Sequence, residues 1–197
     1  MKGLLKFLYM AFGVAAASLA ILLLATDLKY QAWYFLQSLN VEDDGWQRNE
    51  VALDEDAYRL ELFSPELKID RIYTSMTGPA SIHRFSLMPG AAPELVWMTG
   101  YGTEVVDTNM QITLDEAYLC HNNLDYSVGS YYHNWGIKDR QGVLTPRLAT
   151  ITQGQTKINL PEGFGIPLMS NQQMSTATQA LNLFEQDVNK NVRHKIT

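Results

Sequence analysis

The stretch FLYMAFGVAAASLAILLLA, residues 7–25, carries no charged side chain. As an α-helix rising about 1.5 Å per residue it would be roughly 28 Å long, close to the ~30 Å hydrocarbon core of a bilayer. The sequence therefore predicts a single N-terminal transmembrane helix. The membrane anchor is expected to comprise Phe7, Gly13, Ala17 and Leu24 within the span and Tyr30, Trp33 and Tyr34 just beyond it.

A cleaved secretory signal is the alternative interpretation of this stretch. The apolar region of a signal is usually ~7–15 residues long and ends at a small-x-small site. Ser18-Leu19-Ala20 would fit such a site, but four more aliphatic residues follow it. This continuation favours an anchor that is not cleaved.

The charges that flank the span predict its orientation. Lys2 and Lys6 precede it, whereas all 21 acidic residues follow it. The positive-inside rule then places the N-terminus in the cytoplasm and the rest of the chain outside it. Tyr30, Trp33 and Tyr34 share one helical face at headgroup depth, so the anchor segment is expected to occupy residues 1–39.

Small residues at four-residue spacing mark one face of the span. Gly13 and Ala17 form one such pair, and Ala16 and Ala20 another. A surface of this kind lets a second helix approach closely, although small residues are also common in spanning helices generally. The expected partners are the lipid bilayer and other integral-membrane subunits. The acidic remainder of the chain argues against nucleic acid as a partner.

Residues 40–56 are acidic and irregular, and we expect a linker there. Asp54, Glu55 and Asp56 cluster within it, which raises the alternative of a calcium loop. The alternation and central glycine of an EF-hand loop are absent, so a solvated linker is favoured. The remaining residues, 57–197, form the predicted extracytoplasmic domain.

This domain shows the alternation of apolar and polar residues that is typical of strands. In residues 58–63 the apolar side chains of Tyr58, Leu60 and Leu62 share one face, and near the C-terminus Val192, His194 and Ile196 do the same. Short strands at about ten-residue spacing predict a mainly β fold, an antiparallel sandwich of jelly-roll-like type. Further strands are expected at 67–76, 83–87, 95–101, 110–114, 117–120, 147–152, 156–160 and 176–184, the last with one or two helical turns as the alternative. The stretch 95–101 is expected to be buried on both faces, and 147–160 to form a hairpin around residues 153–155.

A long polar and aromatic segment, residues 121–142, interrupts the strands and is expected to be a functional or interface-forming loop. Large aromatic side chains are the usual anchors of protein interfaces. The predicted partner interface consists of Trp46, Tyr131, Tyr132 and Trp135. The last strand is also expected to leave an edge that a partner could complete.

Candidate metal ligands are His83, His121 and His133. No two histidines are closer than twelve residues, so a metal site would need tertiary contacts to assemble it. The most suggestive cluster is Cys120-His121 followed by Asn122, Asn123 and Asp125, for which a structural loop is the favoured alternative. Neither a metal, a cofactor nor a catalytic residue is expected on these grounds.

The stretches Ile72-Tyr73-x-Ser75-Met76-x-x-Pro79 and Leu95-Val96-Trp97-Met98-x-Gly100 resemble the N-terminal β-sandwich of the copper type II, ascorbate-dependent monooxygenases, the peptidylglycine hydroxylating family. That family carries a His-His pair on the corresponding strand, where this chain has Val96-Trp97. A His-x-His sequence for the second copper is also missing. The resemblance therefore implies the fold together with loss of the copper activity.

The general plan is similar to that of small accessory subunits of bacterial photosynthetic or respiratory complexes, with one spanning helix and an extracytoplasmic β domain. The expected function is that of a non-catalytic subunit that docks on and stabilises such an inner-membrane complex, including a reaction centre or light-harvesting assembly. Two alternatives remain open: a copper-dependent monooxygenase-like enzyme using its histidines, and a periplasmic sandwich that binds a ligand.

Overall fold

The computed structural model describes Tyr9, residues 12–19, Ile21 and residues 44–74, 76–90, 92–126 and 147–197. Residues 12–19 are helical, and Gly13 and Ala17 are exposed on this helix. No helix within the described ranges is long and apolar enough to cross a membrane. The other expected anchor residues lie outside the described residues: Phe7, Leu24, Tyr30, Trp33 and Tyr34.

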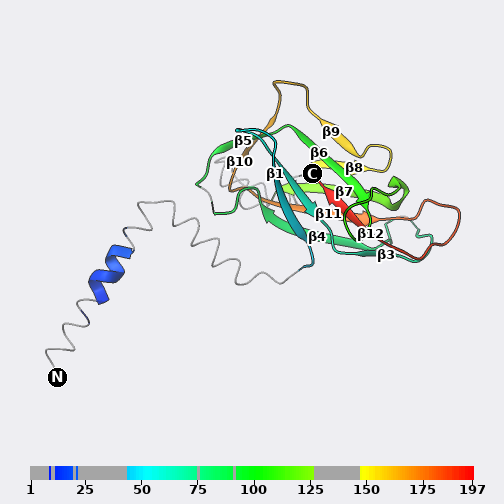
Figure 1. Ribbon diagram of the computed structural model, residues 1–197, viewed down its shortest axis with the longest axis horizontal. Coiled ribbons are helices and arrows are strands. Elements are labelled where there is room, and N and C mark those ends of the chain that lie inside the picture. Colours follow the sequence, from blue (N-terminus) through cyan, green and yellow to red (C-terminus); the bar gives the residue numbers. More distant parts are fainter. Residues whose placement is uncertain are drawn as a thin grey trace, which may run out of the picture.

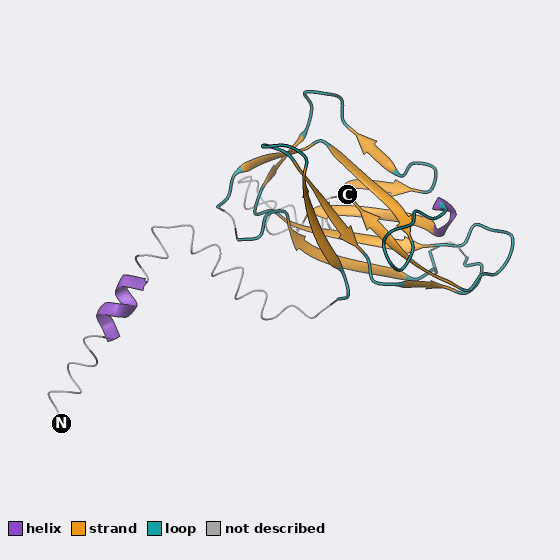
Figure 2. Ribbon diagram, in the orientation of Figure 1, coloured by secondary structure: helices purple, strands orange, loops and turns teal. Residues whose placement is uncertain are grey.

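Antiparallel strands dominate the rest of the described chain (Figure 1, Figure 2), which confirms the expected mainly β class. The elements are β1 (Gln47–Ala52), β2 (Tyr58–Phe63), β3 (Leu67–Ile69), β4 (Ala80–Ser86), β5 (Leu95–Met98), β6 (Gly100–Val106), the 3-10 turn η1 (Glu116–Tyr118), β7 (Leu119–Tyr126), β8 (Arg147–Thr152), β9 (Lys157–Asn159), β10 (Ile166–Met169), β11 (Gln173–Ala180) and β12 (Lys190–Ile196).

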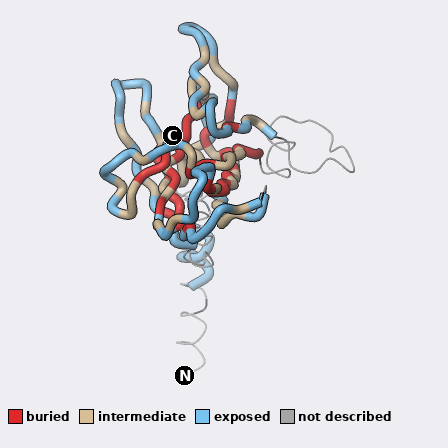
Figure 3. The backbone as a smooth tube through the Cα atoms, turned by 90° about the vertical axis from the view of Figure 1, so that its right-hand side faces the viewer, coloured by how far each residue is buried: buried red, intermediate tan, exposed pale blue. Residues whose placement is uncertain are grey.

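The strands form two main sheets and a short ribbon. One sheet has the order β1-β2-β12-β6-β9, with β3 also paired to β12, and the other has the order β4-β11-β7-β8. Strands β5 and β10 pair with each other and lie together at one end of the domain (Figure 1). The main apolar core joins side chains from both sheets, such as Leu62 and Ile196 from the first with Phe85, Leu124 and Met174 from the second. Buried segments accordingly gather inside the domain (Figure 3), as in a β-sandwich.

Strand β12 is an interior strand. It pairs with β2 and β3 on one side and with β6 on the other, and its inward side chains Val192, His194 and Ile196 are buried. The alternation in the sequence therefore identified the strand and its buried face correctly. The expectation that its edge is free for a partner is wrong along the length of the strand.

Strand β1 lies within the segment that the sequence suggested was a linker. All six of its residues pair with β2. Because β1 is an edge strand, its outward positions can carry charge, and Arg48 pairs with Glu50 at 2.5 Å. The same guanidinium donates to the backbone carbonyls of Ser86 and Leu87 in the other sheet. The expected boundary at residue 57 is therefore too late, since the sandwich includes residues 47–52.

The segment expected to begin a long loop at residue 121 instead continues strand β7 as far as Tyr126. Strand β7 lies inside the second sheet, between β11 and β8. Polar residues occupy this interior strand because their side chains hydrogen-bond one another, as described below. Residues 127–142, with Tyr131, Tyr132, His133 and Trp135, lie outside the described residues.

Residues 147–160 contain the expected turn, but the strands on either side of it do not pair with each other as in the predicted hairpin. Thr152 and Gln155 exchange backbone hydrogen bonds of 3.3 and 3.0 Å around Gly154, whose φ is 85°. However, β8 pairs with β7, whereas β9 pairs with β6. The turn therefore carries the chain from one sheet to the other.

Residues 110–114 form a turn and a single bridge, not the expected strand. The Asp107 carboxylate accepts the backbone N–H groups of Gln111 and Ile112 at 2.8 and 2.9 Å. These bonds hold the pKa of Asp107 below its usual value. Met110 takes a positive φ of 64°, and pairing is limited to the bridge between Val106 and Thr113.

Candidate functional site

An open cavity of about 480 Å³ lies between the two sheets, beside the end of strand β12. Its size is within the ~300–1,000 Å³ range of typical ligand pockets. Most of the lining is apolar and comes from strands of both sheets and from the β5–β10 ribbon. The inner apolar residues are Leu60, Leu62, Phe85, Val96, Met98, Leu124, Leu168, Met174 and Ile196.

Arg59 and Lys195 are among the charged residues that line the cavity, and Glu61 lies beside them. Glu61 accepts from Lys195 at 2.9 Å and from Arg59 at 3.1 Å. Burial raises the pKa of Glu61, but the hydrogen bonds from Lys195 and Asn49, with the charges of Lys195 and Arg59, outweigh it, so the net pKa is lowered. The cavity thus has an apolar interior and a rim whose charges are already partly paired.

Two residues of strand β6 that carry hydroxyl groups, Tyr101 and Thr103, line the cavity. The Thr103 hydroxyl is buried and has no hydrogen-bond partner among the described residues. The Tyr101 hydroxyl donates to the side-chain oxygen of Asn122 on the opposite sheet, and burial raises the pKa of Tyr101. Thr103 therefore offers an unused polar group, whereas the Tyr101 hydroxyl joins the two sheets.

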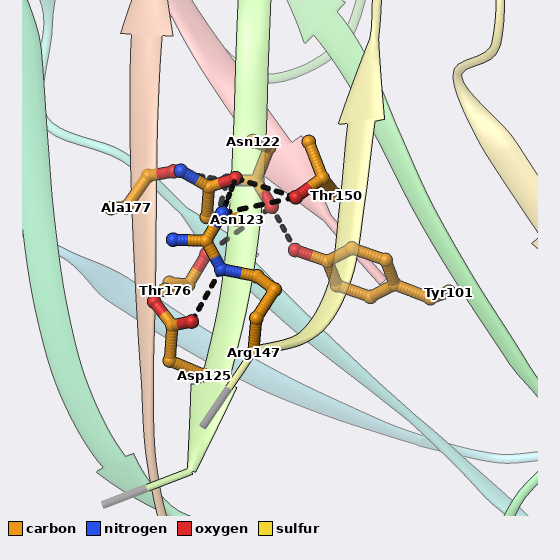
Figure 4. A network of polar contacts seen from close by, with 8 residues as sticks. All are labelled: Tyr101, Asn122, Asn123, Asp125, Arg147, Thr150, Thr176 and Ala177. Atoms are coloured by element: carbon orange, nitrogen blue, oxygen red, sulfur yellow. Dashed lines mark hydrogen bonds and ion pairs between the residues drawn. The ribbon is translucent and has the colours of Figure 1, made fainter. Parts of the chain in front are cut away.

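The Asn122 side chain is the centre of a buried polar network (Figure 4). It is fully buried, and its amide nitrogen donates to the Thr176 hydroxyl at 3.0 Å and to the Ala177 carbonyl at 3.4 Å. Because buried amides need partners, these bonds explain how a polar residue is tolerated in an interior strand.

Arg147, the first residue of β8, bonds to two side chains of strand β7 (Figure 4). Its guanidinium donates to Asp125 at 2.5 Å and to the Asn123 side-chain oxygen at 2.7 Å, and the Thr150 hydroxyl also donates to Asn123, at 2.9 Å. Of the residues that the sequence singled out, Asn123 and Asp125 thus meet at Arg147, whereas Asn122 bonds to a separate set, Tyr101, Thr176 and Ala177.

The described histidines lie apart from one another and have separate environments. His83 contacts the Asp44 carboxylate at 2.6 Å and stacks on Trp46, with 5.2 Å between the ring centroids. His121 contacts the neighbouring Cys120 sulfur at 3.3 Å, and burial, with a smaller effect of Arg147, lowers the pKa of His121. Burial likewise raises the pKa of the Cys120 thiol. Within the described ranges, no group of three or more His, Cys, Asp or Glu residues could hold a metal ion.

His194, which the sequence placed only in a strand pattern, is fully buried. Its Nδ1 is 2.6 Å from the Thr178 hydroxyl and its Nε2 is 3.3 Å from the Tyr118 carbonyl. A carbonyl can only accept, so Nε2 carries the proton and Nδ1 accepts from Thr178 in the neutral ring. Burial lowers the pKa of His194 to about 4.

Trp46, an expected interface residue, is a core residue. It is buried, and its indole nitrogen donates to the Ser81 hydroxyl at 2.9 Å. Trp97 is the opposite case, because the sequence suggested a strand buried on both faces and 58% of its surface is exposed. An apolar run is compatible both with an interior strand and with a two-stranded ribbon that has one open face. The sequence therefore did not indicate that the Trp97 side chain is exposed.

The fold and the cavity define a mainly β, antiparallel sandwich with an open apolar space between its sheets. Comparisons with protein-family models, with curated proteins and with solved structures find no match to this chain.

Proposed function

We propose that this chain is a non-catalytic, membrane-anchored subunit that docks on a larger bacterial inner-membrane assembly, such as a photosynthetic or respiratory complex. The uncharged stretch at residues 7–25 supports the anchor, and Lys2 and Lys6 before it support a cytoplasmic N-terminus. The β-sandwich then lies in the periplasm, where it contacts the partner.

The observation that carries this proposal is the apolar outer face of the β5–β10 ribbon. Leu95 and Trp97 are 52% and 58% exposed, and Phe164, just before β10, is 68% exposed. Trp97 lies opposite the exposed Pro167 in the strand pairing. Leu95 and Trp97 share one face of β5, exposed apolar side chains of this size are characteristic of protein contact sites, and tryptophan is prominent among residues that dominate binding energy.

The tight packing of the ribbon supports a defined contact surface. A Cβ atom added at Gly165 would come within 2.9 Å of the Trp97 Cβ, so the turn before β10 lies directly against this side chain. Trp97 is therefore fixed from one side while most of its ring faces outward. Such a rigid, exposed aromatic side chain loses little conformational entropy on binding.

The test is recovery of the partner with the full chain from native membranes in a gentle detergent. Trp97→Ser should reduce recovery of the co-purifying subunits at least tenfold. Ile82→Ser is the matched control, because Ile82 is 65% exposed on β4 in the other sheet and should not affect recovery. A photo-crosslinking residue at position 97 should give a discrete adduct that is missing when the same residue stands at position 82.

Two results would contradict the proposal. One is a wild-type chain that leaves the membrane without detergent or is recovered free of other subunits. The other is stoichiometric copper in the purified full chain, which would favour the alternative of a copper-dependent enzyme.

A further inference from the structure

Three segments that are far apart in the sequence meet toward the end of the domain opposite the β5–β10 ribbon (Figure 1, Figure 2). They are residues 70–73 after β3, residues 115–118 around η1 and residues 182–188 between β11 and β12. The backbone N–H of Ile72 donates to the Asp187 carboxylate at 2.8 Å. The backbone N–H of Leu183 donates to the Ala117 carbonyl at 3.2 Å. The segment 182–188 is therefore bonded to both of the others.

Apolar side chains are exposed on two of these segments. Ile72 is 47% exposed, Leu183 is 49% exposed and Phe184 is 38% exposed. The Phe184 ring packs partly on the buried Tyr118 ring, with 5.1 Å between the ring centroids. Ile72, Leu183 and Phe184 are called the loop patch below. Exposed apolar side chains that lie together are characteristic of contact sites.

A buried asparagine fixes the loop that presents Leu183 and Phe184. Asn182 is 2% exposed, and its side-chain oxygen accepts the backbone N–H of Phe184 at 3.0 Å. Its amide nitrogen donates to the Gln186 carbonyl at 2.9 Å. The loop patch is thus carried by backbone that is already ordered, so binding there costs little conformational entropy.

Exposed carboxylates accompany the loop patch. The three segments contain five acidic residues and one basic residue: Asp70, Asp115, Glu116, Glu185, Asp187 and Arg71. Arg71 lies 3.5 Å from Asp70, and Lys190 of β12 lies over the Tyr118 ring. Glu116 and Glu185 form no ion pair with another described residue. The surface therefore combines exposed apolar side chains with unpaired negative charge.

This charge decides among the occupants that could cover the loop patch. Anionic lipid headgroups would be repelled by it. The ribbon of a second copy of the chain does not match it, because the exposed Glu94 and Glu162 lie next to Leu95 and close to Phe164 in the sequence. Like charges that face each other across a contact are unfavourable. Lysine or arginine beside apolar residues is the complementary chemistry.

We propose that the loop patch is a second docking surface, which binds a basic amphipathic segment of a partner protein. The apolar residues of that segment cover Ile72, Leu183 and Phe184, and its lysine or arginine side chains pair with Glu116 and Glu185. The proposal goes beyond the docking of the ribbon, because it gives the domain a contact at each end. The two contacts use different residues and can be tested separately.

The first experiment places the photo-crosslinking residue p-benzoylphenylalanine at position 183 of the full chain in native membranes. It should give a discrete protein adduct, and mass spectrometry of the crosslinked peptide should find lysine or arginine beside apolar residues. Raising the salt from ~50 to ~500 mM should lower the adduct yield at least about threefold, since exposed charges are screened. The control is the same residue at position 82, where no such adduct is expected.

The second experiment adds charge reversals to the chain that carries the crosslinker. Glu116→Lys with Glu185→Lys should reduce the adduct at least about tenfold, because attraction becomes repulsion. The matched control is Glu55→Lys with Asp56→Lys, which changes the net charge equally at exposed positions outside the three segments and should change the yield less than about twofold. Near-ultraviolet circular dichroism checks that both variants are folded, and the salt series needs neither of them.

Three results would overturn the proposal: no adduct at position 183, an adduct with lipid or with a second copy of the chain, or an adduct insensitive to salt and to charge reversal. The outcomes also separate the two docking surfaces. Absence of the adduct together with Trp97-dependent partner recovery would refute the loop patch alone. A salt-sensitive adduct with a basic segment, together with unchanged partner recovery in Trp97→Ser, would support the loop patch and refute the ribbon.

Discussion

Two buried threonines differ in whether their hydroxyl groups have a partner. Thr103 and Thr178 are 2% and 1% exposed, but only Thr178 is hydrogen-bonded, to Nδ1 of His194. A buried polar group without a partner costs about 1–3 kcal/mol. Thr103→Val should therefore be neutral or stabilise the fold by up to about 1 kcal/mol, while Thr178→Val should destabilise it by about 1–3 kcal/mol, since it leaves His194 Nδ1 unsatisfied.

The free energy of unfolding in urea measures both changes, and each variant serves as the control for the other. Valine and threonine have nearly the same shape, so packing changes little in either case. A clear loss of stability in Thr103→Val would mean that a bound water or other group uses this hydroxyl in solution.

His194 predicts a pH dependence of stability. Its pKa is about 4 in the folded protein and about 6.5 when exposed, so the unfolded chain binds the proton more tightly. Stability is therefore complete above pH 6.5 and falls as the pH decreases toward 4, by about 3 kcal/mol from this group. His121, whose pKa is also lowered, acts in the same direction.

The variant His194→Gln isolates this contribution. Glutamine can accept from Thr178 and donate to the Tyr118 carbonyl, and it does not titrate. Urea unfolding between pH 7 and 4 should show a shallower slope in the variant. A slope as steep as in the wild type would assign the acid sensitivity to other groups. The lowered pKa of Glu61 affects stability below about pH 4.5, so the interval from 5 to 6.5 reports mainly on histidine.

At the scale of the elements, one hydrogen bond joins strands β6 and β7 across the sandwich. The Tyr101 hydroxyl donates to the Asn122 side-chain oxygen, which also accepts from Thr176 at 3.3 Å. Because Thr176 remains as a partner, Tyr101→Phe should cost only about 1 kcal/mol. Tyr118→Phe is the control, because Tyr118 is also largely buried, at 7% exposed, and its hydroxyl is not one of the buried groups without a partner.

The comparison of the two variants gives the energy of the bond between the sheets, measured as the difference in unfolding free energy. If both changes cost the same, the loss would reflect the removal of a tyrosine hydroxyl in general and not this bond. A loss above about 3 kcal/mol in Tyr101→Phe would show that the whole network around Asn122 depends on it.

The element scale also shows what the sequence could predict. Strands with strict alternation, such as β2 and β12, were located with the correct buried face because alternation follows directly from the pleat. Strands β1 and β7 were missed because they are rich in charged and amide side chains. Their polar groups are satisfied by partners distant in sequence, such as Arg48 with the carbonyls of β4 and Arg147 with Asp125, and no local pattern reports such contacts.

The candidate site was less accessible to sequence reasoning than the strands. The cavity is lined by residues of both sheets and of the β5–β10 ribbon, and their coming together depends on pairing between strands that are far apart in the chain. Histidines were selected as candidate metal ligands by residue type alone. In the structure His83 contacts Asp44 and His121 contacts Cys120. Composition reports which chemistry is available, whereas tertiary contacts decide whether it is used.

At the scale of the whole molecule, the position of the domain boundary can be tested by truncation. Both apolar core clusters consist entirely of residues from Trp46 onward. A chain that begins at Asp44 keeps β1, the Trp46 side chain and the contact of Asp44 with His83. It should therefore unfold cooperatively, with the same free energy as the β domain of the full chain.

A chain that begins at residue 57, the boundary expected from composition, should behave differently. It lacks the six paired residues of β1, the bonds from Arg48 to the other sheet, and the buried Trp46 ring. Loss of a buried tryptophan alone typically costs about 3–5 kcal/mol, a large part of the stability of an ordinary domain. Urea unfolding followed by near-ultraviolet circular dichroism should show a loss of at least that size, or no folded state. Equal stability of the two truncated chains would show that β1 is dispensable and that the domain begins at residue 57.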